Sequence, residues 1–183
     1  MGIVQTMQEK SYLMFVFKTA PYDHQREAFE ASRHAENYAL LMDMGTGKTK
    51  VCIDTIGNNH ERRTIDLAVI IAPKGVIANW IGEISTHLPD RIDREVVLWK
   101  PSLSQAKRKE LTDLAQPSGK LKFLLMNIEA FSTKKGVDVA EYFVNKFKTC
   151  MVVDESTTNN NRRAKRTKSV CDVGRGAVMR RIL

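Results

Sequence analysis

The stretch that decides the fold is Tyr38-Ala39-Leu40-Leu41-Met42-Asp43-Met44-Gly45-Thr46-Gly47-Lys48-Thr49. It begins as an apolar run typical of a buried strand, continues as a glycine-rich loop, and leads into a helix predicted over residues 48–56. Glycines let backbone N–H groups approach phosphate oxygens, and the start of a helix adds positive potential. We therefore predict a phosphate-binding loop, although Met42 stands where the strict motif has glycine. In such a loop Lys48 reaches the β- and γ-phosphates and the Thr49 hydroxyl binds Mg²⁺.

The rest of the chain alternates predicted strands with predicted helices. Strands are expected at residues 11–17, 38–42, 67–72, 94–99, 121–126, 150–153 and 181–183. Helices are expected at residues 22–34, 48–56, 76–88, 102–115, 137–147 and 163–173. This alternation predicts an α/β fold with a central, mostly parallel sheet and helices on both faces. Ligands of such folds bind at the carboxyl ends of the strands.

A pair of carboxylates follows one of these predicted strands. Asp154 and Glu155 come directly after the apolar run Cys150–Val153. A carboxylate at the end of a buried strand can hold Mg²⁺ through its water shell, and a second can orient and deprotonate an attacking water. A solvated acidic turn is the alternative, but the phosphate loop earlier in the chain favours the second half of a nucleotide site.

Four motifs in order resemble the first RecA-like lobe of a superfamily-two helicase or translocase of the Swi/Snf type, including phage and bacterial forms. They are Pro21–Gln25, Asp43–Thr49, Ile71–Lys74 with Asn79 and Trp80, and Asp154–Thr157. The resemblance implies an N-terminal extension over residues 1–20 and a RecA-like lobe over 21–183. It also implies that the chain stops before the third helicase motif.

The resemblance also assigns roles to single residues. It implies an ATP site in which Gln25 reads the adenine and the loop holds the phosphates through Met44, Gly45, Thr46, Gly47, Lys48 and Thr49. Catalytic roles fall to Lys48, Asp154 and Glu155, with Mg²⁺ held by Thr49 and Asp154. Lys74 lies in the segment that contacts the nucleic-acid backbone in relatives, whereas Trp80 has the spacing of a core residue. The acidic motif ends in Ser156 and Thr157 where many relatives have a histidine, which puts the coupling role of that histidine in doubt.

The positive charge of the chain is concentrated near its end. The net charge is +8, and residues 161–183 carry eight Lys or Arg side chains against Asp172 alone. The remaining 21 basic and 20 acidic side chains nearly balance. We expect Arg162, Arg163, Lys165 and Arg166 to contact DNA phosphates, which would make binding salt-dependent. The alternative is a solvated basic helix.

Composition narrows the function further. The longest apolar runs are too short to span a membrane, and three cysteines without a paired motif argue against a disulfide framework or a zinc site. We expect a cytoplasmic ATPase of a bacterial or phage-infected cell, weak or inactive as an isolated lobe, whose partners are DNA and a second RecA-like lobe. The alternatives are a restriction-system motor, a non-hydrolysing nucleic-acid or protein-binding module, and, less favoured, a small-molecule kinase. The choice between DNA and RNA stays open.

Overall fold

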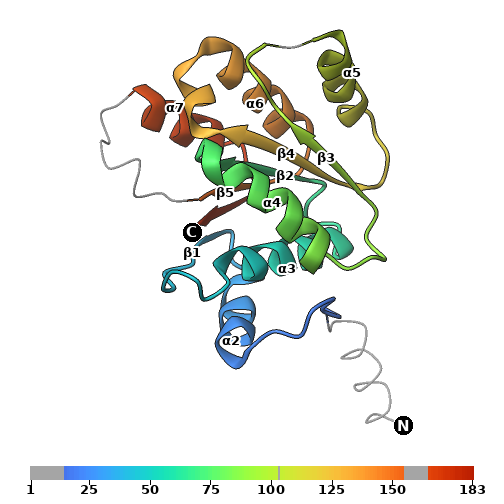
Figure 1. Cartoon of the computed structure of the whole chain (residues 1–183), viewed down its shortest axis with the longest axis vertical. Coiled ribbons are helices and arrows are strands. Elements are labelled where there is room, and N and C mark those ends of the chain that lie inside the picture. The colour runs from blue at the N-terminus through green and yellow to red at the C-terminus, as the bar shows by residue number, and fades with distance from the viewer. Residues whose placement is uncertain (1–14, 103, 155–164) are drawn as a thin grey trace.

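The computed structural model describes residues 15–102, 104–154 and 165–183, which form one sheet covered by helices (Figure 1). The strand order is β1-β6-β5-β2-β4-β3, and every neighbouring pair is parallel. The strands are β1 (Asn37–Ala39), β2 (Leu67–Ala72), β3 (Arg94–Leu98), β4 (Leu121–Asn127), β5 (Thr149–Val153) and β6 (Met179–Ile182). The predicted α/β class with a parallel sheet is confirmed.

Helices cover both faces of this sheet, as Figure 1 shows. One layer contains α2 (Asp23–Ser32), α3 (Lys48–Glu61) and α4 (Lys74–His87), drawn below the sheet. The other contains α5 (Gln105–Leu114), the 3₁₀ helix η1 (Ile128–Ser132), α6 (Lys134–Lys146) and α7 (Lys165–Gly174). Each layer packs on its own apolar cluster. Because both faces are covered, the central strand β2 is buried along its whole length.

Two of the predicted strands differ from the structure. The run 38–42 was predicted as a buried strand, but β1 has only three residues, and Asn37 and Ala39 are exposed. The reason is its position at the edge of the sheet that the described residues form, where it pairs with β6 and no second strand. Of the strand predicted at 11–17, only 15–17 lies within the described residues, and it forms no strand. Instead Phe15 and Phe17 pack their rings against Phe29 of α2.

Two arginines that contribute to the positive charge of the C-terminal segment, Arg180 and Arg181, have structural roles. They lie side by side in β6, so their side chains leave opposite faces of the sheet. Arg181 is buried and donates to Ser32 O and Glu36 O, beside the end of α2. Arg180 donates to Gly174 O, Arg175 O and Ala177 O at the end of α7. Their charge therefore supports the backbone of the fold.

Across the described part of the chain, no helix is both long enough and apolar enough to cross a membrane.

Candidate nucleotide site

The predicted phosphate loop lies between β1 and α3 and has the backbone conformation that its glycines allow. Gly45 and Gly47 have φ angles of 78° and 89°, which lie in the left-handed region. A turn closes the loop, since the hydroxyl of Thr46 donates to Asp43 O at 2.7 Å. Helix α3 begins at Lys48 with Gly47 as its N-cap. The loop therefore presents backbone N–H groups beside a helix N-terminus, as phosphate binding requires.

Lys48 lies against the carbonyl oxygens of its own loop. Its Nζ donates to Met42 O at 3.0 Å, and the side chain is partly buried. The ammonium is thus already held at the base of the loop by the residue that replaces the usual glycine. The side chain of Met44, in contrast, is 94 % exposed, so Met44 can serve a phosphate only through its backbone.

Helix α2 supports the loop from beneath through Gln25. Its Nε2 donates to Thr46 O at 3.0 Å, and its Oε1 accepts from Tyr22 N at 3.1 Å. The side chain is buried, and a Cβ built on Gly47 would overlap the Gln25 amide. A ring nitrogen of His24 lies 3.0 Å from the same Thr46 O. Gln25, the residue predicted to read adenine, therefore fixes the shape of the phosphate loop.

Asp154 stands at the end of β5 and is held by two hydrogen bonds to the neighbouring layer and strand. Its backbone N donates to Ile71 O of β2 at 2.8 Å, and its Oδ2 accepts from Trp80 Nε1 of α4 at 2.8 Å. The residue is only 8 % exposed. Trp80 is buried in the core, as predicted, and its indole N–H is in addition bonded to this carboxylate.

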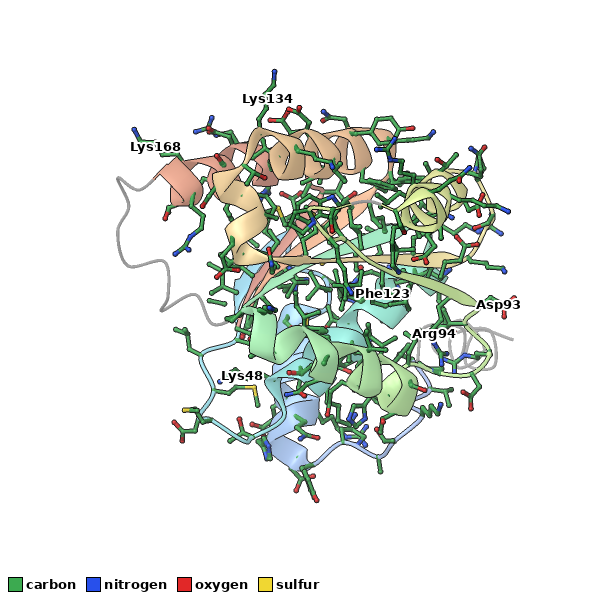
Figure 2. The ribbon with its side chains drawn as sticks, turned by 45° about the horizontal axis from the view of Figure 1, so that its top comes forward. Lys48, Asp93, Arg94, Phe123, Lys134 and Lys168 are labelled. Atoms are coloured by element: carbon green, nitrogen blue, oxygen red, sulfur yellow. The ribbon has the colours of Figure 1, made fainter. Side chains whose placement is uncertain are left out.

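Strand order places the loop and the carboxylate on the same edge of the sheet. In the described sheet, β6 lies between β1 and β5 and pairs with both. Leu40 N donates to Ile182 O, and Leu183 N donates to Val153 O, so the ends of the three strands are tied in a row. The carboxyl edge of the sheet therefore brings together the two halves of the site that the sequence predicted. Figure 2 shows Lys48 at one end of the molecule and Asp93 and Arg94, at the start of β3, at the other.

Lys74 lies at the same edge of the sheet, shortly after the end of the neighbouring strand β2. It is the first residue of α4, its side chain is exposed, and Pro73 before it is the N-cap. Beyond it lies a groove of about 540 Å³ whose lining includes Lys74, Ile81, Lys100 and Asn127. The lining of this groove thus combines two exposed lysines with apolar side chains.

Several predicted site residues lie outside the described residues. They are Glu155, Arg162 and Arg163. Lys165 begins α7, and Arg166 follows it and is partly buried. Figure 2 shows Lys168 of α7 and Lys134 of α6 projecting outward from the layer opposite α3.

The residues present fit a nucleotide with Mg²⁺. The two left-handed glycines form a cradle, and a Cβ built on Gly45 would meet no atom of the described residues within 4 Å. Mg²⁺ keeps several waters in proteins and takes few protein ligands beside phosphates. A hydroxyl at Thr49 and a carboxylate at Asp154 match that donor set. Neither the support by His24 nor the Trp80 bond has a sequence signal, because both depend on residues brought together only by folding.

Comparison with known proteins identifies the family of the chain. The model of the SNF2-related domain family matches residues 22–178. A comparison with curated proteins found no match.

Three solved structures show a similar fold. The SWI2/SNF2 ATPase core of Sulfolobus solfataricus in complex with dsDNA has a TM-score of 0.65 and 17% identity, over 93% of this chain and 34% of that one. The UvsW helicase of bacteriophage T4 has a TM-score of 0.60 and 11% identity, over 90% of this chain and 52% of that one. The Type ISP restriction-modification enzyme LlaGI, in a nuclease-deletion form with a DNA substrate mimic, has a TM-score of 0.58 and 13% identity, over 90% of this chain and 17% of that one. This chain therefore spans about a third of the length of the archaeal core.

Proposed function

Since this chain belongs to the SNF2-related domain family, we propose that it is the ATP-binding N-terminal lobe of an ATP-dependent DNA helicase or translocase. Its chemistry would be hydrolysis of ATP, coupled to movement on DNA when a second RecA-like lobe is paired with it. The observation that carries this proposal is the row of tied strand ends, which aligns the phosphate loop with Asp154 on one edge of the sheet.

Each half of the proposed site has a defined task. The loop amides from Gly45 to Lys48 would bind phosphate oxygens, and the Lys48 ammonium would exchange Met42 O for the β- and γ-phosphates. Thr49 and Asp154 would hold Mg²⁺, which supplies charge neutralisation on the phosphates when bound. Glu155 would take the proton of the attacking water.

Hydrolysis is proposed to need more than this lobe. In RecA-like motors resembling this chain, the second lobe supplies arginines that complete the ATP site, and an arginine of this kind contributes about 10³–10⁵ in turnover. We expect this polypeptide to bind Mg·ATP with modest affinity and to hydrolyse it slowly.

Lys74 is the proposed first contact with DNA. Its exposed ammonium stands at the start of α4, where the helix dipole adds to its positive charge. Lys100 on the rim of the adjacent groove and the basic residues 162–166 would extend the contact to further phosphates. Such contacts read charge and not sequence, so affinity should fall steeply with salt.

A restriction-system motor is the second candidate. The observation that favours it is the similar fold of LlaGI, a restriction-modification enzyme, over 90% of this chain. The proposed chemistry of the lobe is the same in both cases, and the attached domains would differ.

Two variants test the proposal, because each should weaken the binding of a different ligand. Lys48→Ala should abolish binding of Mg·ATP and leave DNA affinity intact, whereas Lys74→Ala should weaken DNA binding and leave ATP affinity intact. Both affinities can be measured by fluorescence anisotropy with labelled ATP and with labelled single-stranded DNA, duplex DNA and RNA. Equal ATP affinity in the wild type and in Lys48→Ala would overturn the nucleotide site.

A further inference from the structure

A buried hydrogen bond joins the two functional halves of the proposed lobe. Trp80 Nε1 donates to Asp154 Oδ2 at 2.8 Å, across 74 positions of sequence. Trp80 is 1 % exposed. A charge-assisted hydrogen bond between two buried groups is strong and directional, because water does not compete with it. The indole therefore fixes the orientation of the carboxylate that is proposed to hold Mg²⁺.

The same aspartate is tied to this part of the chain a second time. Its backbone N donates to Ile71 O at the end of β2. The segment from Ile71 to Trp80 is thus attached to Asp154 at both of its ends. Lys74, the proposed DNA contact, lies inside that segment.

We propose that Trp80 is a positioning residue that couples DNA binding at Lys74 to the orientation of the Asp154 carboxylate. The inference rests on the proposed function of the lobe and adds a route between its two ligands. Lys74 and Trp80 belong to the same helix, α4, and six residues of helix span about 9 Å. A DNA phosphate that binds the Lys74 ammonium shifts this segment of α4. The indole N–H of Trp80 then transmits the shift to Asp154.

Coupling of this kind has a measurable size. If DNA changes the affinity for Mg·ATP by some factor, Mg·ATP must change the affinity for DNA by the same factor. Factors of about 5 to 150 are typical of such coupling. We expect a factor of about 5 or more in the wild type and a factor close to 1 when the indole N–H is removed.

The chain offers a matched control, since it contains two tryptophans. Trp99 is 2 % exposed, in the core of the opposite layer. Within the described residues, its Nε1 has no hydrogen-bond partner. Trp80→Phe and Trp99→Phe therefore make the same chemical change in two equally buried places, and only the first removes a donor to Asp154.

The experiment measures the dissociation constant of Mg·ATP, with and without saturating duplex DNA, on the full chain. The expected result is that DNA shifts this constant equally in the wild type and in Trp99→Phe, and no longer shifts it in Trp80→Phe. The same shift in both variants would overturn the inference, as would a wild type that binds both ligands without any coupling. A wild type that binds neither ligand would instead refute the proposed function, which distinguishes the two failures.

A second measurement does not require Trp80 to be replaced. A chain with two tryptophans gives two indole N–H signals in a ¹H–¹⁵N spectrum, and Trp99→Phe identifies the signal of Trp80. Duplex DNA and Mg·ATP should each move the Trp80 signal, and Lys74→Ala should abolish the movement caused by DNA. A Trp80 signal that stays in place while both ligands bind would overturn the coupling, even if Trp80→Phe fails to fold.

Discussion

A buried ion pair in α3 should make the stability of the chain depend on pH. Lys50 Nζ lies 2.6 Å from Asp54 Oδ2, and both side chains are buried. Within the described residues, Asp54 Oδ1 has no hydrogen-bond partner. Burial raises the pKa of Asp54 to about 6, and the bond from Lys50 offsets this only in part. The perturbation that tests this is the double variant Lys50→Met with Asp54→Leu, since an apolar pair of similar size is often tolerated in place of a buried ion pair.

The sign and size follow from the two pKa values of Asp54. An aspartate in an unfolded chain has a pKa of about 3.9, whereas the native value is about 6. Between these values the native state binds more protons than the unfolded state, so the free energy of unfolding falls as the pH rises. The stabilising contribution is complete below about pH 4 and is lost as the pH passes through about 6. The difference of about 2 between the native and unfolded pKa values of Asp54 corresponds to about 3 kcal/mol in the free energy of unfolding.

His87 of α4 needs a control because its pKa is also shifted, and this shift affects stability with the opposite sign. Burial lowers its pKa, and Glu83 opposes this while Lys50 adds to it. Its contribution to stability is therefore lost as the pH falls, so the comparison belongs in a His87→Gln background.

The assay is urea unfolding followed by circular dichroism at intervals between pH 4 and pH 7. The free energy of unfolding of the double variant, minus that of its parent, should rise by about 2 kcal/mol from pH 4 to pH 7, because about half of the unfolded chains still carry a protonated Asp54 at pH 4. A difference that stays constant across this range would show that Asp54 titrates normally and would refute the reasoning. Added salt should change the result little, because a buried pair is poorly screened.

Two further predictions concern backbone support. Gly47→Ala should weaken Mg·ATP binding at least tenfold, because Gly47 has a φ of 89° and a Cβ there would overlap the Gln25 amide. Gly82→Ala, at an open helical position of α4, is the control. Equal affinity for Mg·ATP in both variants would contradict this prediction. Arg181→Met should lower the free energy of unfolding by about 2 kcal/mol, because it removes charged donors from Ser32 O and Glu36 O; an unchanged urea midpoint would count against that role.

The sequence was sufficient for those parts of the fold that depend on apolar runs and on a local motif. Strand β2 is apolar along its whole length because both faces are covered, and the phosphate loop depends on glycines whose backbone needs are local. It was insufficient for β1, since an apolar run does not reveal whether a strand lies at the centre or at the edge of a sheet.

Charge is the second case in which sequence and structure differ, for a different reason. A count of basic residues treats Arg180 and Arg181 as part of one positive surface, but neighbouring strand residues point to opposite faces. One therefore supports the end of α7 and the other the end of α2. Likewise, helical spacing placed Trp80 in the core correctly, yet it contains no information on which polar atom the indole N–H will meet.

Three helices of one layer support the candidate nucleotide site through Gln25, Gly47 and Trp80. Helix α2 holds Thr46 O through Gln25, α3 begins at the loop, and α4 holds Asp154 through Trp80. Figure 1 shows these three helices together on one face of the sheet. A ligand that moves any one of them therefore acts on the loop or on the carboxylate directly, without deforming the sheet. Since Lys74 begins α4, nucleic acid bound there would reach the nucleotide site by a shorter path than nucleic acid bound to α6 or α7 in the other layer. Under the proposed function, this arrangement would let one lobe respond to DNA and nucleotide together.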